Sequence, residues 1–397
     1  MNVKIENSFL SGTVKAIPSK SYAHRIAICN FLAGGDPVSG CVGFTSKDIS
    51  ATEKALKDIK SGKREIDCGE SGSTLRFLLP LCAAVGGEFT LIGHGKLMER
   101  PNEELFSVMG MHGVKAQKTD RIRISGSLTP GEYRIRGDIS SQYVSGLLMT
   151  LPVLDGDSKI VLTTPLVSAP YVEITLQVLK AFGVNVERTD NGFNIRGGQK
   201  YVGKVLPEGD WSNAAFFLAA GAINGDITVT GLNLESVQGD KYIIEILKKA
   251  GATVLTNQGG VTVKKSELKS FIYDAEDCPD LVPISAVIAA YADGTSVIKN
   301  IQRLKIKESD RIESTIAMLN AFGINAASDG ENLAVIGGKV IAGEANSYND
   351  HRIAMAAAVL SIGANGVSVV TDAKAINKSY PTFFDDYNSV GGKASDL

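Results

Sequence analysis

A repeat punctuated by glycines constrains this chain more than any other feature of its sequence. Six apolar runs of helix length each end at a glycine or just before one. From the second run onward the closing glycines recur at intervals of 69 residues, at Gly87, Gly156, Gly225 and Gly294. Gly366 follows 72 residues later, whereas only 52 residues separate Gly35 from Gly87, so the first repeat is shorter. A near-constant period of this length indicates repeated supersecondary units.

A second pattern lies between the apolar runs. Amphipathic helices end at glycines spaced 70, 68 and 72 residues apart, at Gly113, Gly183, Gly251 and Gly323. Alternating pairs such as Val184–Val186 and Phe193–Ile195 flank an Asp-Asn-Gly turn, which is typical of a β-hairpin. We therefore expect six units, each with one fully buried helix, one amphipathic helix and several strands. Six units favour two domains of three, and a solenoid is the alternative that the repeat leaves open.

Composition narrows the class of protein. The 397 residues are 44% hydrophobic and 21% charged with a net charge of -2, so nothing indicates a nucleic-acid partner. No apolar run is long enough for a membrane span, and the first ten residues lack the apolar core of a signal peptide. Five cysteines without a CxxC pair indicate reduced thiols. We expect a cytoplasmic protein without membrane or nucleic-acid partners.

The polar turns before the apolar runs hold the residues that are candidates for ligand binding and catalysis. Those turns are Pro18–Arg25, Gly69–Arg76, Ser140–Gln142, Cys278–Asp280 and Asn349–Arg352. Several cations lie at or just after a predicted helix start, where a positive charge opposes the helix dipole: Lys20, Arg25, Arg76 and Arg352. An anionic ligand would remove that conflict, and free amides at a helix start also favour anions. The remaining turn, Ser212-Asn213, is interpreted as a helix cap.

Further basic residues stand outside these turns. Arg100 precedes Pro101, Lys378 follows Asn377, and the spacing of Lys307 and Arg311 predicts one shared helix face. Ser21 and Arg25 have the same spacing of four. The four histidines (His24, His94, His112 and His351) show no metal-ligand spacing, and His24 and His112 are interpreted as structural. We expect no metal and no cofactor.

Together these motifs resemble the EPSP synthase family of enolpyruvyl transferases, and the resemblance runs from Val14 to Phe384. The motifs that carry it are Pro18–Ser21 with Arg25, Gly72–Arg76, Glu99–Pro101, Ser140–Gln142, Pro279-Asp280, Lys307–Arg311, Asn349–Arg352 and Asn377-Lys378. The resemblance implies an α/β fold of two similar domains, an inside-out α/β barrel. Each domain would hold three βαβαββ units with buried helices. The domains would be residues 1–18 with 209–397, and 19–208, with the ligands in the cleft between them.

The resemblance also implies an activity, namely transfer of the enolpyruvyl group of phosphoenolpyruvate to the 5-hydroxyl of shikimate 3-phosphate by addition and elimination. Asp280 would be the base and Glu308 the proton donor, with Lys20 and His351 assisting. Shikimate 3-phosphate would be bound by Lys20, Ser21, Arg25, Ser140, Ser141, Gln142, Ser168, Tyr171, Asp280 and Lys307. Phosphoenolpyruvate would be bound by Lys20, Gly72, Arg100, Gln142, Arg311, Arg352 and Lys378. These two small molecules would be the only partners of a monomer.

Two positions leave questions open, and two alternatives compete. Some family members have asparagine where this chain has Arg303, and Arg76 fits either a ligand contact or a structural ion pair. Glyphosate competes with phosphoenolpyruvate at the family position of Gly72, so we expect inhibition. The related UDP-N-acetylglucosamine enolpyruvyl transferases usually carry a reactive cysteine before the Arg-Pro motif, but Gly93–Glu99 contains none. A non-catalytic anion-binding protein is the other alternative, although Asp280 and Glu308 are both present.

Overall fold

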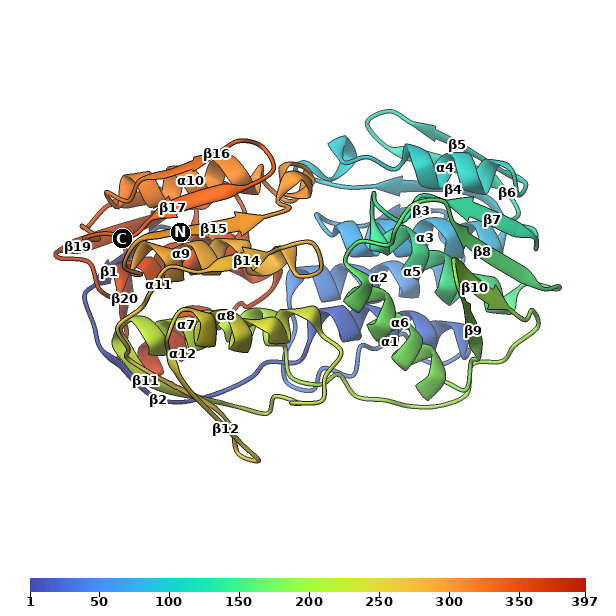
Figure 1. Cartoon of the computed structure of the whole chain (residues 1–397). Helices are drawn as coiled ribbons and strands as arrows, with labels where there is room; N and C mark the ends of the chain where they lie inside the picture. The colour runs from blue at the N-terminus through green and yellow to red at the C-terminus, as the bar shows by residue number, and fades with distance from the viewer. The chain divides into compact units, whose positions relative to one another are not determined.

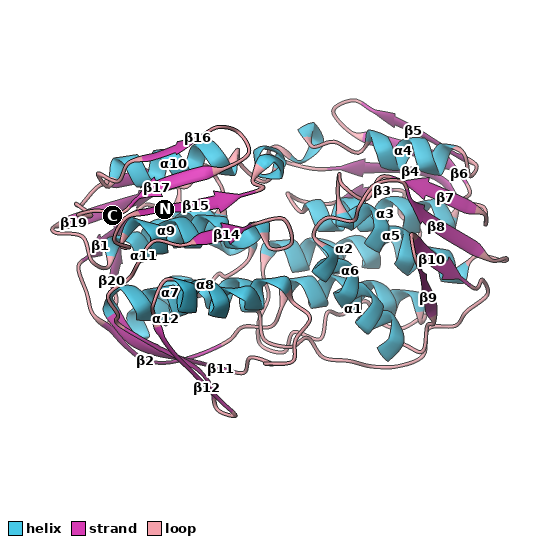
Figure 2. Cartoon of the chain, in the orientation of Figure 1, coloured by secondary structure: helices cyan, strands magenta, loops and turns pink.

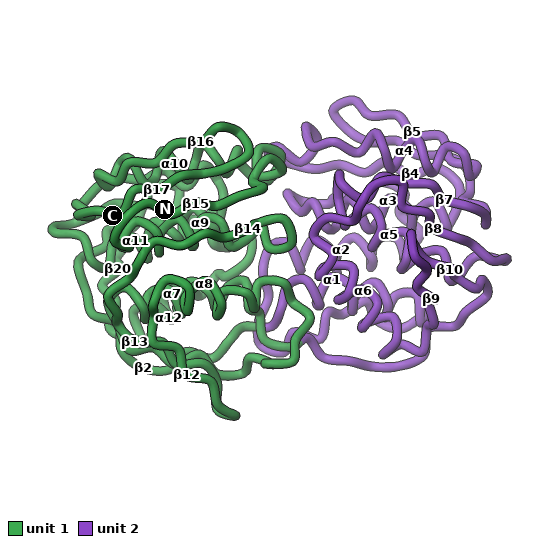
Figure 3. Tube along the Cα trace, in the orientation of Figure 1, with its two compact units in different colours: residues 1–17, 208–397 green, residues 18–207 purple.

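The computed structural model describes all residues from 1 to 397 (Figure 1). The chain is a mixed α/β protein with five four-stranded sheets, and Figure 2 shows the sheets lying beside groups of helices. It divides into two compact units, shown in Figure 3. Unit 1 combines residues 1–17 with 208–397, and unit 2 comprises residues 18–207. None of the helices combines the length and the apolar character needed to cross a lipid bilayer.

Unit 1 contains three complete βαβαββ units. The first consists of β2 (Leu10–Lys15), α7 (Trp211–Asn224), β11 (Gly225–Thr230), α8 (Ile243–Lys249), β12 (Thr253–Asn257) and β13 (Gly260–Lys264). The second consists of β14 (Ile272–Asp274), α9 (Val282–Ala290), β15 (Thr295–Lys299), α10 (Arg311–Ala321), β16 (Ala326–Ser328) and β17 (Leu333–Ile336). The third consists of β18 (Glu344–Asn346), α11 (His351–Ser361), β19 (Val367–Thr371), α12 (Phe383–Ser389), β20 (Lys393–Asp396) and β1 (Val3–Glu6).

Unit 2 contains two complete units and one reduced unit. The complete units are β3 (Glu65–Asp67), α3 (Gly72–Val85), β4 (Gly87–Ile92), α4 (Glu103–Gly110), β5 (Val114–Lys118) and β6 (Ile122–Gly126), then β7 (Glu132–Ile135), α5 (Ser141–Thr150), β8 (Ser158–Leu162), α6 (Ala169–Ala181), β9 (Val186–Thr189) and β10 (Gly192–Ile195). The reduced unit has α1 (Lys20–Leu32) and α2 (Lys47–Lys60) but no strand. The expectation of several strands in every unit is therefore wrong for the first one. The missing strands account for its shorter repeat interval.

In all five sheets the first strand of a unit runs parallel to the second, as in β7 with β8. In four of them a closing hairpin adds two antiparallel strands, as in β9 and β10 beside β8, whereas in the fifth β1 and β20 take these places. Residues at the start of the chain complete two sheets of unit 1. β1 lies antiparallel between β19 and β20, and β2 runs parallel to β11. The chain start and end therefore meet in one sheet, where Val3 is paired with both Val370 and Asp396.

The helices predicted to be apolar all round form the core of each unit. All residues of α9 and α11 are buried, as are 13 of the 14 residues of α7. These three helices pack against one another in unit 1, whereas α5 contacts α1 and α3 in unit 2. At Gly146 a Cβ atom would lie 2.9 Å from the Arg76 carbonyl, so glycine permits the close approach of α5 to α3. Burial on every side explains why these sequences show no polar face.

Candidate active site

The inner helices of unit 1 begin with a cluster of opposite charges. Asp280 lies in η4 (Pro279–Leu281), immediately before α9. Its carboxylate accepts a hydrogen bond from Arg311 at 2.8 Å and one from Arg352 at 2.9 Å, and Lys307 Nζ lies 3.6 Å away. Arg352 also donates to the Asp280 carbonyl at 3.2 Å. The structure thus brings three predicted cations of unit 1 together around the carboxylate of a fourth predicted residue, Asp280.

Arg311 is the most enclosed of these cations. Its side chain is 1% exposed and bonds three carboxylates, with Nε 2.7 Å from Asp350, Nη1 on Asp280 and Nη2 2.6 Å from Glu308. Burial opposes the charge, but Asp350, Glu308 and Asp280 together raise the pKa of Arg311 well above its ordinary value. Asp350 also caps α11 by accepting the Arg352 backbone N–H at 2.9 Å. Its fixed position at the helix start orients the Arg311 guanidinium.

Lys307 reaches the cluster by a different route from the one predicted. Lys307 follows η5 (Gln302–Ile306), and α10 begins only at Arg311, so the two residues do not share a helix face. They meet because both contact the same Asp280 oxygen. Burial lowers the pKa of Lys307 to about 8, with Asp280 acting in the opposite direction and Arg311 adding to the lowering. At a pH slightly above neutrality, a fraction of the Lys307 side chains therefore carries no charge.

Two further parts of unit 1 adjoin this cluster. Lys378 ends η6 (Ala373–Lys378) and donates to the Asn349 carbonyl at 2.6 Å, close in sequence to the predicted assistant His351. Asn349 has a φ of 55°, a left-handed conformation that is uncommon outside glycine and that turns the chain into α11. His351 is buried as the first residue of α11. This strained turn gathers Asn349, Asp350, His351 and Arg352 at one helix start.

Arg25 is a buried cation of unit 2, in the second turn of α1. It is 2% exposed, and its guanidinium donates to Thr175 at 2.6 Å, to the Ser21 carbonyl at 2.8 Å, to Ser145 at 3.2 Å and to the Tyr171 carbonyl at 2.9 Å. All four acceptors are neutral oxygens, and burial lowers the pKa of Arg25 to about 10. A buried guanidinium without a carboxylate partner is costly, which favours an incoming anion.

Lys20 and Gln142 are also held by side chains of unit 2. Lys20 begins α1, and its Nζ lies 2.8 Å from Asp48 in the first turn of α2. Gln142 donates to Ser73 at 2.9 Å and accepts from Arg76 at 2.7 Å. Arg76 also donates to the Asn102 side chain at 3.3 Å. These contacts fasten the starts of α3 and α5 to each other.

Gly72 and Arg100 lie in immediate contact. A Cβ atom at Gly72 would stand 2.9 Å from the Arg100 guanidinium carbon, so the arginine packs over the bare backbone at the start of α3. Serines mark the starts of α5 and α6. Ser140 caps α5, and Ser168 precedes α6 with a left-handed φ of 53°. The Tyr171 backbone N–H donates to the Ser168 carbonyl at 3.1 Å.

The structure corrects one sequence interpretation and adds detail to two others. The cap of α7 is Asp210, whose carboxylate accepts the Asn213 backbone N–H at 2.8 Å, because the helix begins two residues before the predicted Asn213 turn. Arg303 donates to the Glu276 carbonyl at 2.6 Å. His24 is buried against Thr52 at 2.7 Å, and burial lowers its pKa well below the ordinary value, as suits a neutral structural histidine.

Three carboxylates at these helix starts were not assigned a role from the sequence. Asp48 pairs with Lys20, Asp350 pairs with Arg311, and burial beside Asp280 raises the pKa of Asp240. Asp350 belongs to a motif that was recognised, and its place directly before a helix was the available signal. Asp48 and Asp240 belong to none of the recognised motifs, and only their packing places them near functional groups.

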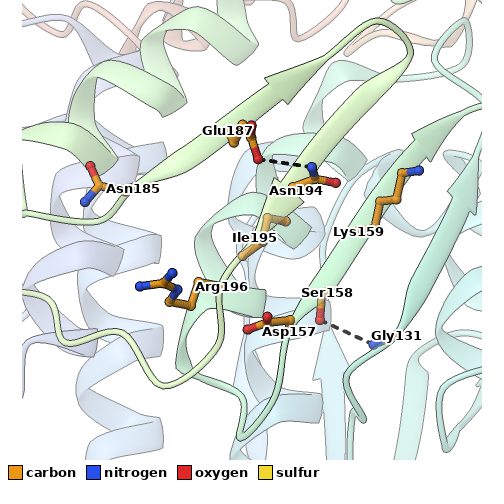
Figure 4. Close-up of a pocket in the computed structure, with 9 residues that line it drawn as sticks. All are labelled: Gly131, Asp157, Ser158, Lys159, Asn185, Glu187, Asn194, Ile195 and Arg196. Carbon is orange, nitrogen blue, oxygen red and sulfur yellow. Dashed lines mark hydrogen bonds between the residues drawn. The ribbon is translucent and has the colours of Figure 1, made fainter.

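A separate groove lies away from all of the predicted site residues. Figure 4 shows this groove of about 700 Å³ in unit 2, lined by residues of β8, β9, β10 and neighbouring turns. Within the groove, the Asn194 side-chain amide donates a hydrogen bond to the Glu187 carboxylate at 3.1 Å (Figure 4). No group of three or more His, Cys, Asp or Glu side chains is arranged so that it could hold a metal ion.

Comparison with solved structures places this architecture among known folds. EPSP synthase from Acinetobacter baumannii matches with a TM-score of 0.79 at 24% identity, covering 100% of both chains. The enolpyruvyl transferase NikO from Streptomyces tendae matches with a TM-score of 0.78 at 17% identity, covering 99% of this chain and 98% of that one. The chain therefore has the fold of these two enolpyruvyl transferases.

Sequence comparisons narrow the class to one family. The family model of EPSP synthase (3-phosphoshikimate 1-carboxyvinyltransferase) matches residues 45–387. The 3-phosphoshikimate 1-carboxyvinyltransferases of Clostridium novyi and Clostridium kluyveri are 38% and 40% identical to this chain. Each alignment covers 98% of this chain, with 98% of the first relative and 97% of the second. The chain belongs to the EPSP synthase family and is an enzyme.

Proposed function

We propose that this chain transfers the enolpyruvyl group of phosphoenolpyruvate to the 5-hydroxyl of shikimate 3-phosphate, with release of phosphate. The family and the names of its relatives support this reaction. One structural observation supports it most directly: buried cations lie near the starts of several helices, and among them Arg25 bonds only neutral oxygens. The two substrates carry two phosphates and two carboxylates between them. Such anions would supply the counter-charge that Arg25 lacks.

Both compact units would act as domains that serve the same two substrates. Shikimate 3-phosphate would bind Lys20, Ser21, Arg25, Ser140, Ser141, Gln142, Ser168, Tyr171, Asp280 and Lys307. Phosphoenolpyruvate would bind Lys20, Gly72, Arg100, Gln142, Arg311, Arg352 and Lys378. Arginine forks suit carboxylate and phosphate oxygens, whereas Lys307 and Lys378 offer point charges. We also propose that the enzyme is a cytoplasmic monomer without metal or cofactor, and light scattering would test its mass in solution.

Arg311 and Arg352 would couple binding to chemistry. In the structure both guanidinium groups bond the Asp280 carboxylate, and Arg311 also bonds Glu308. A carboxylate held by two guanidinium groups is a weak base. Phosphoenolpyruvate would compete for these forks, while Asp350 continues to hold Arg311 through Nε. Substrate binding would thereby free Asp280 to accept a proton and Glu308 to exchange one.

The reaction then proceeds in two steps with all protons accounted for. In the addition, Asp280 takes the proton of the 5-hydroxyl as its oxygen bonds to C2 of phosphoenolpyruvate, and Glu308 delivers a proton to C3. In the elimination, C3 returns a proton to Glu308, the C2–C3 double bond re-forms, and phosphate leaves with the electrons of its C–O bond. The departing phosphate takes up the proton held by Asp280, so both carboxyl groups return to their starting states. Lys20, held by Asp48 at 2.8 Å, and His351 would stabilise charge that develops on the phosphate and carboxylate.

Phosphate release with defined acceptors tests this proposal. The purified chain would be supplied with phosphoenolpyruvate and either shikimate 3-phosphate or UDP-N-acetylglucosamine. We expect release only with shikimate 3-phosphate, and a fall of at least about 100-fold in kcat for Asp280→Asn if it removes the general base. Asp274→Asn is the matched control because Asp274 is exposed and its carboxylate contacts the Asn300 side chain. The proposal would be refuted if phosphate were released only with UDP-N-acetylglucosamine. It would also be refuted if no phosphate were released with either acceptor.

A further inference from the structure

Two side chains that the proposed mechanism does not use join two loops of unit 2. Asp67 ends β3, and His94 follows the neighbouring parallel strand β4. His94 Nε2 lies 3.1 Å from Asp67 Oδ1, and the same oxygen accepts the Gly69 backbone N–H at 2.9 Å. The His94 backbone N–H in turn donates to the Gly69 carbonyl at 2.8 Å. Asp67 and His94 therefore tie the turn after β3 to the loop after β4.

Both loops lead to residues assigned to phosphoenolpyruvate. The turn at Gly69 runs directly into α3, whose first residue is Gly72. The loop at His94 continues through η1 (Leu97–Glu99) to Arg100. The loops converge where a Cβ atom at Gly72 would stand 2.9 Å from the Arg100 guanidinium carbon.

The two ends of the Arg100 loop are anchored differently. Downstream, the Arg100 carbonyl accepts hydrogen bonds from Lys118 at 2.9 Å and from the Asn102 side chain at 3.1 Å. Upstream, one side-chain anchor is the contact of His94 with Asp67. Burial acts to raise the pKa of Asp67, but its bonds from Gly69 and His94 lower it overall, so the carboxylate stays ionised.

We propose that Asp67 and His94 form a positioning pair that sets the location of the Arg100 guanidinium over Gly72 and thereby the affinity for phosphoenolpyruvate. This inference rests on the proposed function. The side chains are 36% and 60% exposed, so the pair adds little to overall stability. Its effect is local because it joins the two loops that carry the binding groups. Neither side chain need touch the substrate.

Steady-state kinetics with a double-mutant cycle tests this pair. We expect His94→Ala and Asp67→Ala each to raise the KM for phosphoenolpyruvate about three- to fivefold, the loss expected for an exposed charged contact. The kcat and the KM for shikimate 3-phosphate should change by less than about twofold, because only ground-state binding of one substrate is affected. His94→Gln, which keeps a side-chain donor, should recover part of the affinity. Lys96→Ala is the matched control, because it removes an exposed cation from the same loop.

The cycle distinguishes a coupled pair from two unrelated effects. If the pair acts as one unit, the double variant will resemble Asp67→Ala alone. Effects that multiply, equal rises in KM for both substrates, or the same rise for Lys96→Ala would overturn the inference while leaving the proposed function intact. An unaltered chain that releases no phosphate from shikimate 3-phosphate and phosphoenolpyruvate would overturn the proposed function and this inference together.

Discussion

Replacing Asp350 with asparagine removes one charge from the interior of unit 1 while preserving the size of the side chain. Asp350 is completely buried and accepts hydrogen bonds from Arg311 Nε at 2.7 Å, Arg311 Nη2 at 3.3 Å, Ser309 at 3.1 Å and the Arg352 backbone N–H at 2.9 Å. The asparagine amide would direct a donor toward a guanidinium donor. Breaking a buried ion pair costs about 3–5 kcal/mol. Arg311 keeps its contacts with Asp280 and Glu308. We therefore expect Asp350→Asn to lower the free energy of unfolding by about 3 kcal/mol, the lower end of that range.

The single tryptophan makes this loss measurable in the correct part of the molecule. Trp211 is buried in α7, within unit 1, so its fluorescence reports the unfolding of that unit. With a slope of about 3 kcal/mol per molar urea, the midpoint should fall by about 1 M. Asp310→Asn is the matched control, because Asp310 caps α10 through two backbone N–H groups and asparagine caps equally well. Equal midpoints for the two variants would refute the argument that Asp350 balances Arg311.

Three further predictions concern the substrates. Gly72→Ala should raise the KM for phosphoenolpyruvate at least about tenfold and weaken inhibition by glyphosate. The reason is that the added Cβ displaces the Arg100 guanidinium, so that a charged hydrogen bond to the ligand is lost. An unchanged KM in initial-rate assays would contradict this prediction. Because the pKa of Lys307 is lowered to about 8, its cation is present below that pH and lost above it. The kcat/KM for shikimate 3-phosphate should therefore fall as pH rises through about 8, and Lys307→Arg should remove this decline. Arg25→Lys should raise the KM for shikimate 3-phosphate about tenfold through loss of the guanidinium fork, with the KM for phosphoenolpyruvate as internal control; equal changes in both constants would argue for a general loss of structure.

Local patterns predicted much of the fold because they report local physics. A helix buried on every side must be apolar throughout, so α7, α9 and α11 were visible as apolar runs. Hairpins such as β9 with β10 were visible as alternating pairs around a turn. The reduced first unit could not be predicted in the same way. Its short interval was evident, but which elements were missing depended on pairing partners elsewhere in the chain.

The sequence likewise predicted some features of the candidate site and not others. Cations at helix starts were recognisable because they contradict the helix dipole, and Arg25, Arg311 and Arg352 were identified on that basis or by family resemblance. Their protein partners were not recognisable. Lys20 pairs with Asp48, which is 28 residues away, and Arg311 Nε binds Asp350 at a separation of 39 residues.

The sequence alone determined which segments are buried, where helices stop and which turns carry charge, since each depends on residues within a few positions of one another. Only the tertiary structure decided that β1 closes the last sheet, that Asp280 gathers Lys307, Arg311 and Arg352, and that Arg100 packs over Gly72. These contacts join residues far apart in the chain. Their formation depends on how whole helices and sheets pack, and no local pattern of residues records that packing.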